Sequence, residues 1–314
     1  MPSTVALTGA SGFIGQAIAN QLSQAGVKVR GLVRTHPKIP GLEHPNITLI
    51  NGSLNNLESL HTLIQGCDSL INCAGSIRGR RREDFIATNV QGVTNLLKVC
   101  LSQSFPPQII QISSLAAREP SLSSYAWSKQ EGERIIQEQA DSLKWVIIRP
   151  PAVYGPGDKA LLPLFQLAKK GIALQLGPHE GKFSLIHVSD LTDVIVRCLE
   201  ADTIRSTIFE VDDGFPNGYS WESVFHVLNP HIKGHLRIPP KLLWLAGKSN
   251  EILSQLFRYS PLFTTGKVAE LCHTNWVCDS LEARKQLEWV PQIPLAEGLR
   301  HLFASDNLMI SKKN

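Results

Sequence analysis

The sequence has no long apolar run, and it is poor in charge of either sign. None of its stretches approaches about 18 consecutive apolar residues, which excludes a transmembrane helix. Charged residues make up only 18% of the 314-residue chain, and its net charge is +4. A nucleic-acid-binding protein normally carries a basic stripe and a larger excess of cations. We therefore expect neither a nucleic-acid nor a membrane partner.

Paired cysteines are also absent. The six cysteines form no C-x-x-C pair, although Cys272 and Cys278 stand loosely around His273. Zinc sites and disulfide frameworks normally show closely spaced cysteines, so we predict no metal site and reduced, mostly buried thiols. No signal peptide is recognisable before the first apolar run, and we expect a soluble, cytoplasmic protein.

Short apolar runs alternate with helical patterns through the first two thirds of the chain. This alternation predicts an α/β fold of the Rossmann type, in which helices cover both faces of a doubly wound parallel sheet. The predicted strands are residues 5–8, 27–33, 47–50, 69–73, 108–113 and 145–149.

The composition of the chain changes after Pro150-Pro151, where irregular segments rich in proline, glycine and aromatic residues follow. We expect a dinucleotide-binding domain over residues 1–168 and a smaller C-terminal substrate-binding lobe mainly over 169–314. Two later segments, 183–188 and 207–211, still look like strands. Residues 184–214 are therefore expected to return to the first domain, which would leave the two parts interleaved.

A glycine-rich turn connects the first strand to an amphipathic helical pattern. Its sequence places glycines at every third position and supplies the expected cofactor contacts, namely Gly9, Ser11, Gly12, Phe13, Ile14 and Gly15. Glycine permits the tight turn, the approach of a pyrophosphate and the close packing of helix on strand. Exposed N–H groups at the start of the helix would hold the diphosphate. The turn thus predicts a dinucleotide site.

The end of the second strand indicates which dinucleotide is bound. An acidic residue there accepts hydrogen bonds from the ribose of NAD, whereas a cation accommodates the 2′-phosphate of NADP. This sequence has Val33 followed by Arg34. Because an arginine fork suits a phosphate dianion, we predict NADP(H), with NAD(H) as the alternative.

A candidate catalytic pair lies at Tyr125 and Lys129. Residues four apart share a helix face, so the phenol and the ammonium can point at one site. A tyrosine with its usual pKa of about 10 is a poor base, and we expect the lysine charge to lower that pKa. The preceding strand ends in Ser113-Ser114, and a hydroxyl from this pair could hold the substrate oxygen during proton transfer.

Together these motifs resemble the extended branch of the short-chain dehydrogenase/reductase superfamily, which includes nucleotide-sugar epimerases and dehydratases. The resemblance implies that Tyr125 is the acid/base, that Lys129 also holds the nicotinamide ribose, and that Ser114 is the third member, with Ser113 as the alternative. It further implies cofactor contacts at Ser53, Leu54, Ala74 and Pro150. The matching segments are residues 8–15, 72–75, 149–158 and 183–191, together with Asn89.

Two departures from the family pattern bear on function. Ser53 stands where an aspartate commonly contacts adenine, so we expect a weaker or differently formed adenine contact. Leu115-Ala116 replaces the acidic pair that many dehydratases carry after the strand-end serine, which argues against elimination of water.

Two features bear on the substrate. A loop after the fourth strand carries Arg78, Arg80, Arg81 and Arg82, which either steer an acidic substrate such as a nucleotide sugar or form a solvated loop. Apolar residues at helical spacing over 242–257 are interpreted as packing of the C-terminal lobe, with a wall for a hydrophobic substrate as the alternative.

The resulting hypothesis is an NAD(P)-dependent oxidoreductase that acts on a small molecule by hydride transfer, in the manner of a nucleotide-sugar epimerase. The alternatives are an NADPH-dependent ketone reductase or hydroxyl dehydrogenase acting on a non-sugar substrate, and a cofactor-binding subunit without turnover. The resemblance also implies a homodimer.

Overall fold

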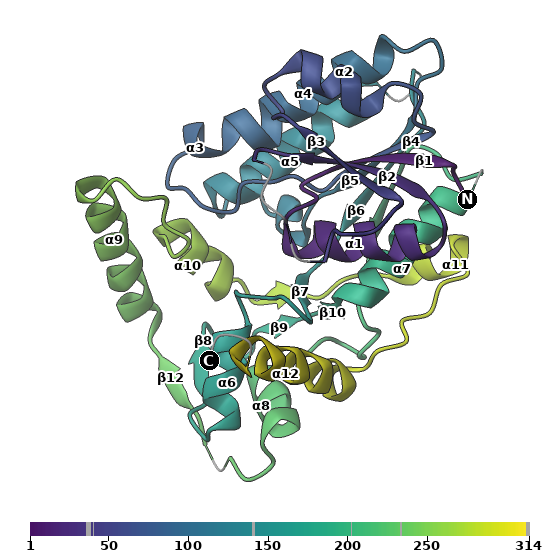
Figure 1. Cartoon of the computed structure of the whole chain (residues 1–314). Coiled ribbons are helices and arrows are strands. Elements are labelled where there is room, and N and C mark those ends of the chain that lie inside the picture. The colour runs from purple at the N-terminus through teal and green to yellow at the C-terminus, as the bar shows by residue number, and fades with distance from the viewer. Residues whose placement is uncertain (36–38, 40, 140–141, 202, 233, 312–314) are drawn as a thin grey trace.

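The computed structural model describes residues 1–35, 39, 41–139, 142–201, 203–232 and 234–311. Within this part of the chain, a 7-stranded sheet has the order β11-β6-β5-β4-β1-β2-β3, and every neighbouring pair is parallel (Figure 1). Its strands are β1 (Thr4–Thr8), β2 (Lys28–Val33), β3 (Ile47–Asn51), β4 (Ser69–Asn72), β5 (Gln108–Ile112), β6 (Trp145–Arg149) and β11 (Thr207–Glu210). The first six agree with the predicted strands to within one residue at each end.

Helices cover both faces of this sheet (Figure 1). One face carries α1 (Phe13–Gln24), α7 (Val188–Glu200) and α11 (Leu281–Gln286). The opposite face carries α2 (Leu57–Ile64), α4 (Gln91–Leu101) and α5 (Ser124–Gln137). The predicted doubly wound α/β fold is thereby confirmed.

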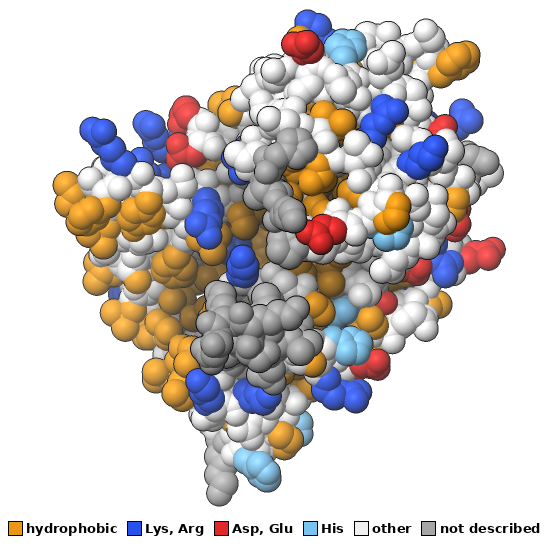
Figure 2. Space-filling model, viewed as in Figure 1, with side chains coloured by type: hydrophobic (Ala, Val, Ile, Leu, Met, Phe, Trp, Pro, Cys, Tyr) orange, Lys and Arg blue, Asp and Glu red, His pale blue; other side chains and the backbone are white. Residues whose placement is uncertain are grey.

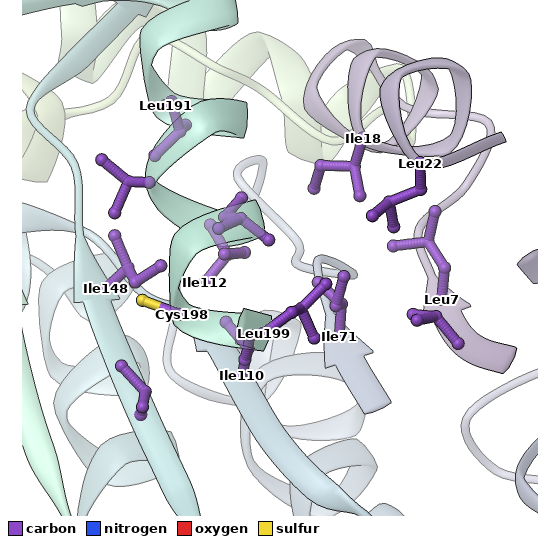
Figure 3. Packing of buried hydrophobic residues seen from close by; sticks show 14 of the residues in the cluster. Leu7, Ile18, Leu22, Ile71, Ile110, Ile112, Ile148, Leu191, Cys198 and Leu199 are labelled. Carbon is purple, nitrogen blue, oxygen red and sulfur yellow. The ribbon is translucent and has the colours of Figure 1, made fainter. Parts of the chain in front are cut away.

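Apolar side chains fill the space between the sheet and its helices. Figure 3 shows Ile18 and Leu22 of α1 and Leu191 of α7 directed toward the sheet. Ile110 and Ile148 of the central strands meet them and are fully buried. Strands buried on both faces need apolar residues on both sides, which explains the nearly continuous apolar runs in the sequence.

The C-terminal half adds short paired strands. Of the segment expected to return, Thr207–Glu210 lies beside β6 as β11, whereas residues 182–187 form β9 and β10 in smaller sheets. The pairs are β7 (Ala152–Tyr154) with β10 (Leu185–His187), β8 (Leu174–Leu176) with β12 (Leu236–Ile238), and β9 (Lys182–Phe183) with β13 (Asn275–Trp276).

The remaining helices surround these short sheets or connect them to the main one. They are α6 (Leu162–Lys169), α8 (Trp221–Leu228), α9 (Pro240–Leu256), α10 (Thr265–Cys272) and α12 (Leu295–Ser311). A short helix α3 (Glu83–Phe85) leads into the π-helical turn η1 (Ile86–Val90), and a 3₁₀ turn η2 (Leu115–Arg118) follows β5. In the described part of the chain, none of the helices has the length and apolar content needed to cross a bilayer.

The apolar segment over 242–257 does not pack as expected. It forms most of α9, which stands at the edge of the lobe (Figure 1), and of its predicted apolar residues only Leu243 is buried. Leu245 and Leu256 are 57% and 72% exposed. The interpretation of this segment as lobe packing is therefore wrong, because the helix turns small and polar residues toward its neighbour α10.

Candidate active site

The glycine turn between β1 and α1 has the close contacts that its spacing predicts. Gly9 adopts a φ of +68°, and a Cβ there would lie 2.8 Å from the backbone N of Ala74. A Cβ on Gly15 would lie 2.0 Å from the carbonyl oxygen of Gly9. The turn is closed by the Gly12 N–H, which donates to Gly9 at 2.9 Å. Gly9 and Gly15 therefore accept only glycine without rearrangement of the backbone.

The first turn of α1 is open to a ligand. Gly12 is its N-cap, and no described side chain caps the helix or places an acid in its first turn. The N–H groups of Phe13, Ile14 and Gly15 lack intrahelical acceptors in this position, so they fit the diphosphate of a dinucleotide. Ser11 and Gly12 are exposed beside them. The residues present therefore fit the predicted cofactor.

The end of β4 lies directly against this turn. The backbone N–H of Ala74 donates to the Thr8 hydroxyl at 3.1 Å, and that hydroxyl donates in turn to Asn72. Asn72 also donates to Gln111 of β5 at 2.8 Å. This chain of hydrogen bonds holds the carboxyl ends of β1, β4 and β5 in register, where ligands bind in open α/β sheets.

The other predicted cofactor contacts differ in their exposure. Arg34 is exposed at the end of β2, and Ser53 is half-buried after β3. Leu54 is 8% exposed and packs on α4, against Gly92. Pro150 is buried, and its carbonyl accepts a hydrogen bond from Leu115 at 2.9 Å.

Helix α5 carries the candidate catalytic pair. Its N-cap Ser123 accepts a hydrogen bond from the Ala126 N–H at 2.9 Å, so the helix begins at Ser124, one residue before Tyr125. Lys129 follows one turn later and is 7% exposed. Its ammonium donates to the Ile112 carbonyl at the end of β5 at 2.8 Å. The helix thus places both side chains at the end of the central strands.

Burial shifts the pKa of both groups. It lowers the pKa of Lys129 to about 8, although the nearby Cys73 and Glu133 act to raise it. Burial raises the pKa of Tyr125 to about 12, opposed by a side-chain hydrogen bond with Ser114 and assisted by the charge of Glu270. The expected lowering of the Tyr125 pKa by Lys129 is therefore not seen. At neutral pH the tyrosine is a neutral phenol and the lysine is mainly protonated.

The two strand-end serines have different surroundings. Ser113 is 6% exposed, and its hydroxyl donates to Glu133. That carboxylate is 1% exposed and also pairs with Arg149 at 2.6 Å. Ser114 instead turns toward Tyr125 and accepts a hydrogen bond from the Ala116 N–H at 3.2 Å. Of the two hydroxyls, the structure brings only that of Ser114 to the tyrosine.

Asn89 joins the loop after β4 to helix α5. Its side chain accepts a hydrogen bond from the Ser76 N–H at 2.8 Å and donates to the Ser128 hydroxyl at 2.8 Å. A Cβ on Gly75 would lie 3.8 Å from Nζ of Lys129, so this loop forms the wall beside the lysine. Asn89 occurs in η1, and π-turns of this kind are frequent at functional sites.

Sequence reasoning missed the contribution of α10. Glu270 is 6% exposed and accepts a hydrogen bond from Ser123 at the start of α5. Its carboxylate lies in the C-terminal lobe, 145 residues after Tyr125, and no motif in the sequence connects the two. Tyr154, within the matching segment 149–158, is fully buried, and its hydroxyl lies against Gly298.

The profile of the NAD dependent epimerase/dehydratase family matches residues 5–211. The chain belongs to this family. Its members use a nicotinamide cofactor, and the glycine turn lies within the matched region. The chain is therefore an oxidoreductase of the extended short-chain dehydrogenase/reductase type.

Individual relatives differ in the reactions for which they are named. The chain is 33% identical over 303 residues to a ceramide reductase of Caulobacter vibrioides, across 95% of this chain and 90% of that protein. It is 25% identical over 332 residues to a 2-alkyl-3-oxoalkanoate reductase of Stenotrophomonas maltophilia, across 96% and 98%. The solved UDP-glucose 4-epimerase of Thermotoga maritima, with UDP-glucose, has a TM-score of 0.76 at 18% identity, covering 98% and 99%. That last likeness concerns the fold.

Proposed function

We propose that this family member is an NADP(H)-dependent reductase that converts a ketone on a long-chain, apolar substrate into a secondary alcohol. The observation that carries the proposal is the placement of the Tyr125 hydroxyl next to Ser114, one helical turn before the buried Lys129 at the end of β5. Burial also raises the pKa of the Tyr125 phenol, to about 12. A phenol in this state is a proton donor at neutral pH and a poor base. Reduction of a carbonyl needs such a donor.

In this proposal the three side chains have different tasks. The nicotinamide group, when bound, supplies the hydride. Tyr125 gives its proton to the carbonyl oxygen of the substrate, and the Ser114 hydroxyl donates a hydrogen bond to the same oxygen. Lys129, mainly protonated at neutral pH, holds the nicotinamide ribose and stabilises the phenolate that remains.

Cofactor binding follows from the open turn of α1. Gly9, Gly12 and Gly15 admit the diphosphate, and Arg34 at the end of β2 is exposed and free of a described carboxylate partner. We propose that Arg34 pairs with the 2′-phosphate of NADP(H).

The proposed apolar substrate has two supports. The relatives aligned over most of the chain include proteins named for the reduction of ceramides and of 2-alkyl-3-oxoalkanoates. In addition, the lobe helix α9 packs on α10, and α10 contacts the start of α5 next to Tyr125. Figure 2 shows hydrophobic side chains inside the hollow beside this part of the molecule.

A second candidate function is epimerisation of a nucleotide sugar. It is favoured by the arginine loop after β4, where Arg78, Arg81 and Arg82 are exposed and could attract a diphosphate. An epimerase returns the hydride to its substrate, whereas a reductase consumes NADPH in proportion to its product. The two functions are therefore separable by cofactor consumption.

The test is an assay of NADPH consumption with 2-alkyl-3-oxoalkanoates of increasing chain length, with UDP-glucose in a parallel reaction. We expect net oxidation of NADPH and a kcat/KM that rises by up to about fourfold for each CH₂ group buried. A kcat/KM independent of chain length would contradict the apolar substrate. Conversion of UDP-glucose with no net consumption of cofactor would establish the epimerase instead.

A further inference from the structure

Helix α9 contacts the protein mainly through small and polar residues, with Leu243 as its one buried large apolar residue in the described part of the chain. Gly247 lies so close to the following segment that a Cβ would approach the backbone of Thr264 to 3.0 Å. Asn250 donates to the carbonyl of Phe263 at 2.7 Å. The buried positions of the helix are Leu243, Gly247 and Ser254. This pattern is the reverse of an ordinary surface helix, which turns its apolar residues inward.

The opposite face of α9 is apolar and exposed. At about 100° per residue, Leu245, Ile252 and Leu256 lie about 180° around the helix axis from the buried positions. Leu242 and Leu253 lie about 100–120° from the buried positions, and Phe257 follows as the C-cap. The large side chains of this face are between 46% and 72% exposed. Figure 2 shows hydrophobic side chains gathered where Figure 1 places α9. We call this set the α9 face: Leu242, Leu245, Ile252, Leu253, Leu256 and Phe257.

Cations lie beside the α9 face. The arginine loop after β4 is tied to the segment following α9, because the Gly79 N–H donates to the Pro261 carbonyl at 3.0 Å. Residues 77–84 contain four cations and two carboxylates, and residues 237–262 contain four cations and one carboxylate. The two segments thus carry a net charge of +5, whereas the whole chain carries +4. Figure 2 shows Lys and Arg side chains along the upper margin of the apolar area.

The acidic groups of these segments are already included in this net charge, and each has a partner close by. Glu251 is largely buried, accepts hydrogen bonds from Thr265 and lies 3.6 Å from Lys248. Asp84 accepts the backbone N–H groups of Arg80 and Arg81, and so it stabilises the loop itself. Glu83 is exposed, 3.8 Å from Arg81.

We propose that the α9 face docks the protein on an anionic lipid bilayer, with the helix lying in the plane of the surface. Apolar side chains of an interfacial helix enter the boundary between headgroups and acyl chains, and cations beside it attract anionic headgroups. A second copy of the chain fits this surface poorly, because pairing two α9 faces would bring together two basic margins. The bilayer satisfies both the apolar face and the charge.

This inference goes beyond the proposed function, because it concerns where the protein acts and holds for any substrate. The lack of a long apolar run led us to expect no membrane partner, but a helix that lies on a surface needs no such run. Because α9 packs on α10, and α10 contacts the start of α5, a bilayer on the α9 face would lie close to the part of the lobe that borders the candidate active site.

The direct test is co-sedimentation of the full chain with vesicles of phosphatidylcholine, alone or mixed with phosphatidylglycerol. We expect binding to the mixed vesicles that weakens as salt is raised, because each cation near an anionic surface strengthens binding by about fivefold. The L245D/I252D/L256D variant should lose binding by tenfold or more. No binding to the mixed vesicles by the wild-type chain would overturn the proposal.

Two comparisons separate docking from other causes. Phe105 is 90% exposed outside the α9 face, so Phe105→Asp should leave vesicle binding unchanged. Equal loss in both variants would show a nonspecific effect and refute the role of the α9 face. Size-exclusion chromatography of the wild-type chain tests for a second copy: a dimer that the triple variant dissociates would also overturn the proposal. Vesicle binding needs no substrate, so failure of the proposed reaction would leave this result interpretable.

Discussion

Glu270 accepts a hydrogen bond from the hydroxyl of Ser123 at 2.5 Å, and this contact joins the C-terminal lobe to the helix that carries Tyr125. Ser123 caps α5 at the same time, through the N–H of Ala126. The lobe is therefore joined by two consecutive hydrogen bonds to the first turn of the helix that carries the proposed proton donor. A side chain of the lobe can in this way influence the chemistry of the nucleotide-binding part.

Replacement of Glu270 tests that influence. Its negative charge acts to raise the pKa of Tyr125, so Glu270→Gln should lower this pKa while keeping an acceptor for Ser123. In the direction of alcohol oxidation, where the phenolate is the base, the rise of kcat/KM with pH should move to lower pH. Glu251→Gln, an acid-to-amide change on α9, is the matched control and should leave the profile in place. A Glu270→Gln profile that coincides with the wild type would contradict the coupling.

Removal of the proton donor should separate catalysis from binding. Tyr125→Phe deletes the hydroxyl that is hydrogen-bonded with Ser114 and leaves the ring in place. We expect kcat to fall by about 10²–10⁴-fold, the usual range for loss of a general acid. NADPH affinity, followed by fluorescence titration, should stay within about twofold because the glycine turn is untouched. Retention of full activity would remove Tyr125 from the mechanism.

The two serines offer a paired experiment. Ser114→Ala should reduce kcat by about a hundredfold, because it removes a donor to the substrate oxygen. It should also lower the free energy of unfolding by about 1 kcal/mol, because the Ala116 N–H loses its acceptor. Ser113→Ala should leave kcat nearly unchanged and lower the free energy of unfolding by about 1–2 kcal/mol, since buried Glu133 loses a hydrogen bond. Steady-state kinetics and urea unfolding measure the two effects. The reverse pattern would make Ser113 the catalytic serine.

The preference for NADP(H) depends on one side chain. Arg34→Ala should weaken NADPH binding by at least about tenfold, because a charge-assisted pair with the 2′-phosphate is lost. NADH binding should change by less than about twofold, since NADH has no phosphate at that position. Titration of both cofactors against both proteins gives the answer. Equal affinities for NADPH before and after the substitution would refute the assignment.

Asp213 should make stability depend on pH. Burial raises its pKa to about 6, opposed by hydrogen bonds from Tyr219 at 2.6 Å and from the Phe215 N–H. Since the folded pKa exceeds the unfolded value, the folded state binds the extra proton between about pH 4 and 6. The contribution of Asp213 to the free energy of unfolding is therefore fully present below pH 4 and is lost as the pH rises through 6.

The measurement is the difference in urea unfolding between the wild type and Asp213→Asn across pH 4–7. As the pH rises from 4 to 7, we expect the free energy of unfolding of the variant to increase by about 2 kcal/mol relative to that of the wild type. His187 titrates in the opposite sense, because burial lowers its pKa to about 4, but it is common to both proteins and cancels in the difference. A difference that does not vary with pH would show that Asp213 stays ionised in the folded protein.

The sequence alone determined the parallel sheet, the glycine turn and the spacing of Tyr125 and Lys129. These features depend on neighbours along the chain: apolar runs produce buried strands, and a four-residue interval produces a shared helix face. Periodicity also correctly identified an apolar stripe in α9. It could not show which way that stripe faces, because the same apolar periodicity occurs in a helix that packs on the protein and in one whose apolar face is exposed.

Only the tertiary structure decided that orientation, through the close approach of Gly247 to Thr264 and the hydrogen bond from Asn250. It also turned Ser113 toward Glu133 and Ser114 toward Tyr125, and it brought Glu270 to the start of α5. The burial that raises the Tyr125 pKa has the same origin. Solvent exclusion and contacts between distant segments are properties of the packed chain, and no local pattern of residues encodes them.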